Sequence, residues 1–223
     1  MPGPSEKANI SLVEWIVQLP ILFFSVIVHE VSHGLVALRQ GDDTAKRAGR
    51  LTFNPVPHID IMGTILLPAF CFISHLPMVG WAKPVPINPL KMRGRRWGTF
   101  RVALAGPVSN LLLALAAAVA FRVDASLPQK FPQFQRNFMS AMIFAVEINV
   151  FLAFFNLLPV HPLDGGKVMS GLLPLRARLN YDRHAPYGFM IVVLLISFGV
   201  VGKVVTIPSM LTLELFKSMG LIW

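Results

Sequence analysis

HEVSH, at residues 29–33, lies inside an apolar run that extends from residue 10 to residue 38. The length and apolar character of this run predict a helix. On a helix, His29 and His33 lie one turn apart on the same face, so two neutral imidazoles can bind one metal ion. Glu30 lies next to the first histidine, where it can act as a general base on a metal-bound water. Zinc, one ion per chain, is the expected metal, because imidazole and carboxylate ligands with an open fourth position are its catalytic pattern.

A candidate third ligand lies far downstream, in the sequence NLLPVHPLDGG at residues 156–166. Pro159 and Pro162 break the preceding helix, and two glycines free the backbone that follows. Asp164 is therefore expected on an irregular turn at a helix end, with its carboxylate directed back into a bundle. Alone, it reads as a surface residue that initiates a turn. Together with HEVSH at membrane depth, where His and Glu are costly without a role, it reads as a metal ligand.

Composition indicates the fold class. Hydrophobic residues make up 54% of the 223 residues and charged residues 14%, and the mean hydropathy is +0.62. A soluble domain carries about 25% charged residues. We therefore expect an all-α polytopic membrane protein, a single domain over residues 1–223 with about four to six transmembrane helices in a lipid bilayer. The net charge of +9 then reads as loop charge on the cytoplasmic side, and no nucleic-acid partner is expected.

The apolar stretches predict where the helices lie. Helices are expected at roughly residues 11–38, 102–121, 138–158 and 187–207, each near the length that a bilayer requires. The segment 61–82 is apolar but contains two glycines and two prolines. The tail at residues 208–223 is expected either to lie in the membrane interface or to span, and both alternatives stay open.

The zinc site itself constrains the topology. His33 and Asp164 can share a metal only if the ends of their helices lie on one side of the membrane. That parity requires residues 61–82 to enter the membrane and return, as a re-entrant segment. The loops on the motif side then hold 14 of the 20 basic residues. The positive-inside rule places that side, and the site, at the cytoplasmic face of the cell membrane.

Two pieces of extended sequence bracket the re-entrant segment. Residues 49–53 alternate in polarity, and residues 81–86 contain two prolines. They would form a β-hairpin edge near the zinc site that receives an unwound substrate as an added strand. An ordinary surface loop explains the same residues equally well.

Three motifs carry a resemblance to a known family. HEVSHG at residues 29–34, AGPVSN at residues 105–110 and the stretch 156–166 resemble, in order, the signatures of the site-2 proteases, which are intramembrane zinc metalloproteases. The resemblance implies that His29, His33 and Asp164 bind zinc and that Glu30 is the catalytic base. It also implies substrate contacts for Asn156 and Asn110. No gap between the apolar segments is long enough for an inserted PDZ-type domain, so a minimal member is expected.

The expected activity is zinc-dependent hydrolysis of peptide bonds in transmembrane protein substrates, as in regulated intramembrane proteolysis. One alternative is a zinc or cation transporter, because intramembrane His and Asp also mark ion paths. Another is a catalytically inactive binding protein of the same fold. Glu147, inside an apolar helix, and His161, within the third motif, are left outside the expected site. The sequence indicates neither the substrate nor the oligomeric state.

Overall fold

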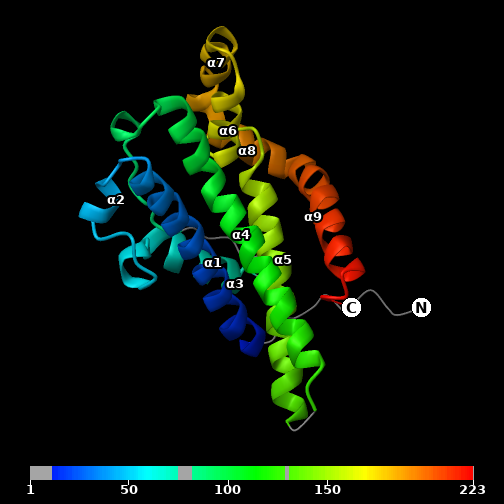
Figure 1. The fold of residues 1–223 in the computed structure, drawn as a ribbon. Helices are drawn as coiled ribbons and strands as arrows, with labels where there is room; N and C mark the ends of the chain where they lie inside the picture. The colour runs from blue at the N-terminus through cyan, green and yellow to red at the C-terminus, as the bar shows by residue number, and fades with distance from the viewer. Residues whose placement is uncertain (1–11, 75–81, 129–130, 223) are drawn as a thin grey trace.

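Three long apolar helices form the centre of the structure, a computed structural model that describes residues 12–74, 82–128 and 131–222 (Figure 1). They are α1 (Leu12–Arg39), α4 (Arg95–Ala125) and α5 (Pro132–Asn156). Each is long and apolar enough to cross a bilayer. The expectation of an all-α polytopic membrane protein is confirmed.

Shorter helices surround this centre. They are α2 (Thr44–Arg47), η1 (Val56–His58), the π-helical η2 (Ile61–Leu66), α3 (Leu67–Ile73), η3 (Pro89–Lys91), α6 (Asp164–Leu172), α7 (Leu175–Asp182), η4 (Ala185–Tyr187), α8 (Gly188–Ser197) and α9 (Val200–Ser218).

The last apolar stretch differs from the continuous helix expected at residues 187–207. It is divided into α8 and α9, and the helical stretch Leu175–Ser197, which ends with α8, meets α9 at a bend of 78°. Gly199 lies at the bend with φ +68°, a left-handed conformation that glycine adopts without strain. Beyond the bend α9 continues through Pro208, so the expected tail at 208–223 is largely part of this helix. The described residues thus contain three candidate spans, or four if the bent pair forms one.

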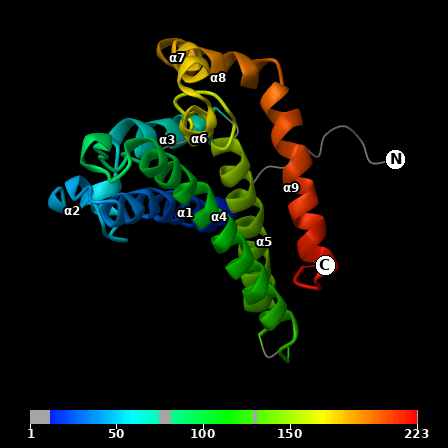
Figure 2. The ribbon, with the colours of Figure 1, turned by 45° about the horizontal axis from the view of Figure 1, so that its top comes forward.

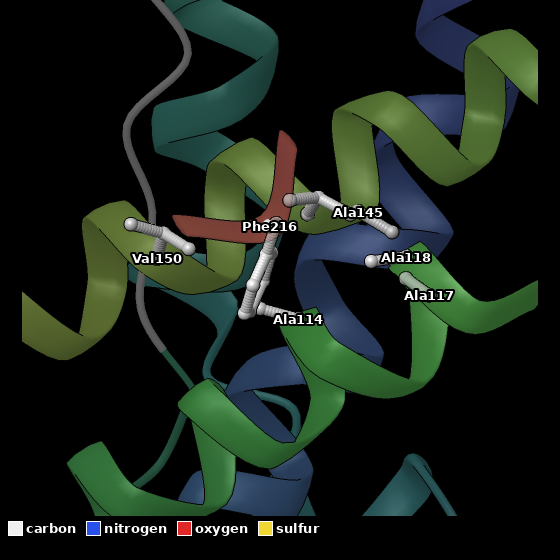
Figure 3. Packing of buried hydrophobic residues seen from close by; sticks show 7 residues of the cluster. Ala114, Ala117, Ala118, Ala145, Val150 and Phe216 are labelled. Carbon is white, nitrogen blue, oxygen red and sulfur yellow. The ribbon is translucent and has the colours of Figure 1, made fainter. Parts of the chain in front are cut away.

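Small side chains bring α4 and α5 close together. Ala114, Ala117 and Ala118 of α4 meet Ala145 of α5 in a buried cluster, which Phe216 of α9 covers (Figure 3). In lipid, helices associate through close van der Waals packing, which small residues permit. Figures 1 and 2 both show α9 running beside α5, and α4 also packs against α1 and α6.

The residues that precede and follow the segment carrying η2 and α3 lie close together. Lys83 N–H donates to the His58 carbonyl at 2.9 Å, and Arg93 N–H donates to Gln40 at the end of α1 at 2.8 Å. The two ends of the segment therefore lie together, and the start of α4 lies near the C-terminus of α1. Residues 75–81 of the expected re-entrant segment lie outside the described residues.

The expected β-hairpin is absent from the described part of the chain, which contains no strand. The Arg50 side chain joins the two extended pieces instead. Its guanidinium donates to the Pro57 carbonyl, to the Lys83 carbonyl at 2.8 Å and to the Pro84 carbonyl at 3.2 Å. One buried arginine thus satisfies carbonyls that a β-ladder would otherwise use.

Candidate metal centre

Helix α1 places two imidazoles on its buried face. His29 and His33 are 6% and 5% exposed, and their ring centroids lie 4.6 Å apart. The spacing of four residues is the cause, because residues one turn apart stack on one side of a helix. His33 lies six residues before the end of α1, which is about 9 Å along the axis.

Asp164 approaches both imidazoles from an element 135 residues away in sequence. Its Oδ2 lies 3.0 Å from Nε2 of His29 and 3.0 Å from Nε2 of His33. The three ligand atoms all lie within 4.8 Å of one another. Asp164 begins helix α6, so it does not occupy the irregular turn expected from the glycines that follow it. The structure therefore brings together all three residues expected to bind metal.

Each histidine uses its other ring nitrogen to bind the protein. Nδ1 of His29 lies 2.6 Å from Oδ1 of Asn110, and Nδ1 of His33 lies 2.6 Å from the carbonyl oxygen of Val102. Both partners are acceptors, so the neutral rings carry their proton on Nδ1. Their Nε2 lone pairs then point to the same place, as a metal ligand requires.

A buried polar network holds Asn110 in turn. Its amide Nδ2 donates to Oδ1 of Asn149 at 2.8 Å, and Asn149 donates to Oγ of Ser25 at 2.8 Å. Asn110 is fully buried, and Asn149 and Ser25 are each 2% exposed. The network joins α4, α5 and α1 behind the ring of His29. Asn110 is fully buried and bonded to His29, so in this structure it positions that histidine, and a contact with substrate stays a prediction.

Gly106 of α4 lies directly against the two rings. A Cβ atom at this position would collide with Nε2 of both His29 and His33. The missing side chain lets the α4 backbone approach the metal-binding atoms closely.

The donor set fits a zinc ion. Two neutral imidazoles and one carboxylate are typical of catalytic zinc, which keeps a fourth position for water or substrate. Lys167 adds an ion pair, with Nζ 3.3 Å from Oδ1 of Asp164. Oδ1 of this carboxylate is thus held by a cation, while Oδ2 faces the imidazoles.

Glu30 is held by the backbone of a distant segment. Its Oε2 accepts from the N–H of Val85 at 2.8 Å, in the extended piece that follows residue 81. Asp42 anchors this piece, accepting from Asn88 N–H at 2.6 Å and from the Thr44 hydroxyl at 2.5 Å. Burial raises the pKa of Asp42, but the bonds from Thr44 and Asn88 outweigh it, so the pKa lies below its ordinary value.

Three other singled-out residues lie outside the ligand cluster. Asn156 ends α5 and donates from Nδ2 to the Leu152 carbonyl of its own helix at 2.9 Å. Nε2 of His161 lies 3.3 Å from Oδ1 of Asp182, beyond the metal ligands. Glu147 lies on α5 in a pocket between that helix and α9.

The sequence-based site omitted five residues that support it: Ser25, Asn149, Val85, Val102 and Lys167. Ser25 and Asn149 carried a usable signal, because polar side chains inside apolar spans are costly unless they have partners. Val85 carried none, since it acts through its backbone N–H.

The profile of "Peptidase family M50" matches residues 126–199. "Putative zinc metalloprotease YwhC" of Bacillus subtilis is 35% identical over 187 residues, which cover 83% of this chain and 81% of that protein. "Putative zinc metalloprotease sll0528" of Synechocystis is 30% identical and "Putative zinc metalloprotease Rip2" of Mycolicibacterium smegmatis is 30% identical. The matched regions cover 69% and 77% of this chain, but only 30% and 63% of those two proteins. No solved structure gives a significant match.

Proposed function

Because this chain belongs to peptidase family M50 and is a zinc metalloprotease, we propose that it hydrolyses peptide bonds within the membrane-embedded segments of its substrates. His29, His33 and Asp164 hold the zinc ion, and Glu30 is the general base. The single observation that carries this proposal is the buried convergence of the three ligands. Glu30, which follows His29 in the sequence, is held beside them by the Val85 N–H.

The chemistry divides between the metal and the chain. When bound, zinc polarises the scissile carbonyl and acidifies a water molecule. Glu30 accepts a proton from that water and later delivers it to the leaving amine. The Val85 N–H fixes one oxygen of Glu30, which leaves the other to move the proton. The Asn110 amide and the Val102 carbonyl keep His29 and His33 in the tautomer that binds metal.

The substrate must expose its backbone before it can be cut. Carbonyls in a transmembrane helix are already hydrogen-bonded, so the substrate has to unwind at the scissile bond. Asn156, at the end of α5, is our candidate for holding the unwound backbone. Helix-breaking residues in the substrate should raise the rate of cleavage.

We further propose that the described helices form one membrane domain whose metal centre faces the cytoplasm. Helix α4 has 31 residues and is about 46 Å long, which exceeds a hydrocarbon core of about 30 Å. Its basic start, Arg95 and Arg96, therefore lies beyond the membrane. The loop between η1 and Lys83 enters from that same side and returns, consistent with the bond between His58 and Lys83.

Purified protein and a model transmembrane substrate test the activity. Glu30→Gln should retain zinc, because Glu30 is not a ligand. Its cleavage rate should fall by a factor of about 10² to 10⁴. Glu147→Gln is the matched control and should cleave normally, since Glu147 lies in another pocket. Chelation should abolish cleavage in the wild type, and added zinc should restore it.

The two alternatives give different results in the same preparation. Zinc flux into proteoliposomes without cleavage would indicate a transporter. Zinc binding with neither cleavage nor flux would indicate an inactive binding protein. Cleavage by Glu30→Gln at the wild-type rate would remove Glu30 from the mechanism.

A further inference from the structure

A second hollow opens beside the metal centre, at the end of the bundle where α4 begins. It has a volume of about 570 Å³ and lies between the start of α4, helix α6 and helix α7. Figures 1 and 2 both show α6 and α7 gathered at this end. Four basic residues line this basic cleft: Arg95, Arg96, Lys167 and Arg178.

Asp182, the acidic residue in the lining of the cleft, is bonded to His161 and Ser170. Oδ1 of Asp182 lies 3.3 Å from Nε2 of His161, and its Oδ2 accepts from the Ser170 hydroxyl at 3.1 Å. Asp182 is therefore bound to neutral or weakly basic groups and forms no ion pair with the arginines of the cleft. Lys167 is paired with Asp164 and Asp182 keeps its charge, so the net positive charge of the lining comes from its arginines.

The basic residues have different roles. Arg96 donates to the carbonyls of Gly171 and Leu173, at 2.7 and 2.8 Å, and so caps the C-terminal end of α6. Arg95 and Arg178 have no ion pair among the residues that the structure describes. Two guanidinium groups from different helices thus line one hollow, where both are available to an anion.

We propose that the basic cleft binds a phosphate-bearing anion. Arginine presents a planar fork of donors that matches phosphate oxygens bidentately. Basic pockets between helices at the cytoplasmic end of a membrane protein bind lipid headgroups. The positive-inside rule accounts for basic loops, but it does not account for their convergence on one concave wall from three separate elements.

The cleft also reaches the metal centre through Lys167. This side chain lines the cleft, and its Nζ lies 3.3 Å from Oδ1 of Asp164. An anion in the cleft draws Lys167 away from Asp164 and adds negative potential near the metal. Both effects favour the divalent cation, so anion and zinc bind with positive coupling. This coupling rests on the proposed zinc site, whereas binding of the anion does not.

Binding is tested on the full chain in detergent. A fluorescent short-chain phosphatidylglycerol is titrated and followed by anisotropy, with pyrophosphate as the soluble competitor. The double variant Arg95→Gln/Arg178→Gln should weaken binding by about tenfold or more. The matched control is Arg93→Gln/Arg176→Gln, which removes the same charge from exposed positions outside the cleft. It should change the Kd by less than about twofold.

The outcomes separate the possibilities. Saturable lipid binding that pyrophosphate displaces supports the cleft with a headgroup as ligand. Saturable pyrophosphate binding without lipid binding supports it with a free phosphate compound as ligand. Equal losses in the two double variants, or no saturable binding of either probe, would overturn the proposal. The zinc content of each variant shows that it has folded.

The coupling has its own readout. The Kd of the phosphate probe is measured for the zinc-free and zinc-loaded protein, and zinc should tighten it by about fivefold or more. Lys167→Gln should remove that difference while leaving saturable binding. An unchanged Kd on zinc loading would overturn the coupling alone. Anion binding by a protein that shows no protease activity would support the anion site and contradict the proposed function.

Discussion

His29 and His33 each direct one ring nitrogen to a protein acceptor and the other to the proposed zinc position. The Nδ1 atoms bind Asn110 and the Val102 carbonyl at 2.6 Å, and the Nε2 atoms face Asp164. This division fixes both the ring orientation and the tautomer, so a metal ion meets ligands that need little rearrangement. At the residue scale, the metal centre therefore depends on its hydrogen-bonded partners as well as on its ligands.

Asp164 is predicted to be indispensable for zinc. Asp164→Ala should lose bound zinc and cleavage together, because it removes the carboxylate from a three-ligand site. His161→Ala is the control, since its ring lies against Asp182 rather than the ligands. Bound zinc per protein, measured by elemental analysis, checks both variants. Full occupancy in Asp164→Ala would show that the third ligand lies elsewhere.

Asn149 is predicted to control zinc affinity from behind Asn110. Asn149→Ala removes the amide acceptor that holds Asn110 against His29, so zinc affinity should fall by about tenfold to a hundredfold. Competition with a chelator measures that affinity. Asn156→Ala is the matched control, because its amide bonds within its own helix. Asn156→Ala should keep wild-type zinc affinity and raise the KM for substrate. Equal zinc affinities in the wild type, Asn149→Ala and Asn156→Ala would contradict the role of Asn149.

At the scale of a helix, α4 contributes shape rather than ligands. Its alanines let α5 approach closely (Figure 3), and Gly106, nearer the start of the helix, leaves room for the histidine rings. Intrinsic propensity alone would make glycine to alanine stabilising inside a helix, by about 1 kcal/mol. At Gly106 the collision with the histidine rings makes the same substitution destabilising.

Gly106→Ala should therefore reduce both zinc content and thermal stability. Its Cβ would collide with Nε2 of His29 and of His33. Gly202→Ala in α9 is the matched control, since a Cβ there meets no atom within 4 Å. That variant should keep zinc and be as stable as the wild type or more so. Thermal unfolding in detergent, with and without chelator, checks both, and normal zinc content in Gly106→Ala would show that the rings can move away.

The whole molecule places both halves of the metal centre at one end of the bundle. Helices α1 and α5 run one way and α4 runs the other, as Figure 1 shows, so the second half of α1 and the start of α6 meet. The bond from Lys83 to His58 brings the two flanks of the segment that carries η2 and α3 together, and the bond from Arg93 to Gln40 brings the start of α4 to the end of α1.

Cysteine labelling tests this arrangement. Single cysteines replace Lys46, Arg93, Leu127 or Arg176 in a Cys71→Ser background, and intact cells are treated with an impermeant maleimide. Only the cysteine at Leu127 should react from outside, because the other three lie on the basic side. Reaction at Arg93 but not at Lys46 would mean that the segment between them crosses the membrane. Reaction at all three basic positions, but not at Leu127, would reverse the orientation and leave the metal centre intact.

The sequence by itself determined the spans and the ligand types. Apolar runs predicted α1, α4 and α5 because hydrophobic length is a local property. The spacing of HEVSH predicted the shared face of His29 and His33, since helical periodicity is local too. The break at Gly199 and the helical start at Asp164 were not anticipated. Each depends on how a glycine-containing stretch packs against neighbouring helices, and glycine permits several conformations.

Only the tertiary structure decided which distant groups meet. The bond from Val85 N–H to Glu30 joins residues 55 apart, and the bond from Asn149 to Ser25 joins residues 124 apart. The ion pair between Lys167 and Asp164 links the metal centre to the basic cleft, which Lys167 also lines. Such contacts have no period in the sequence, because they arise when packed helices leave one partner within reach of each buried polar group.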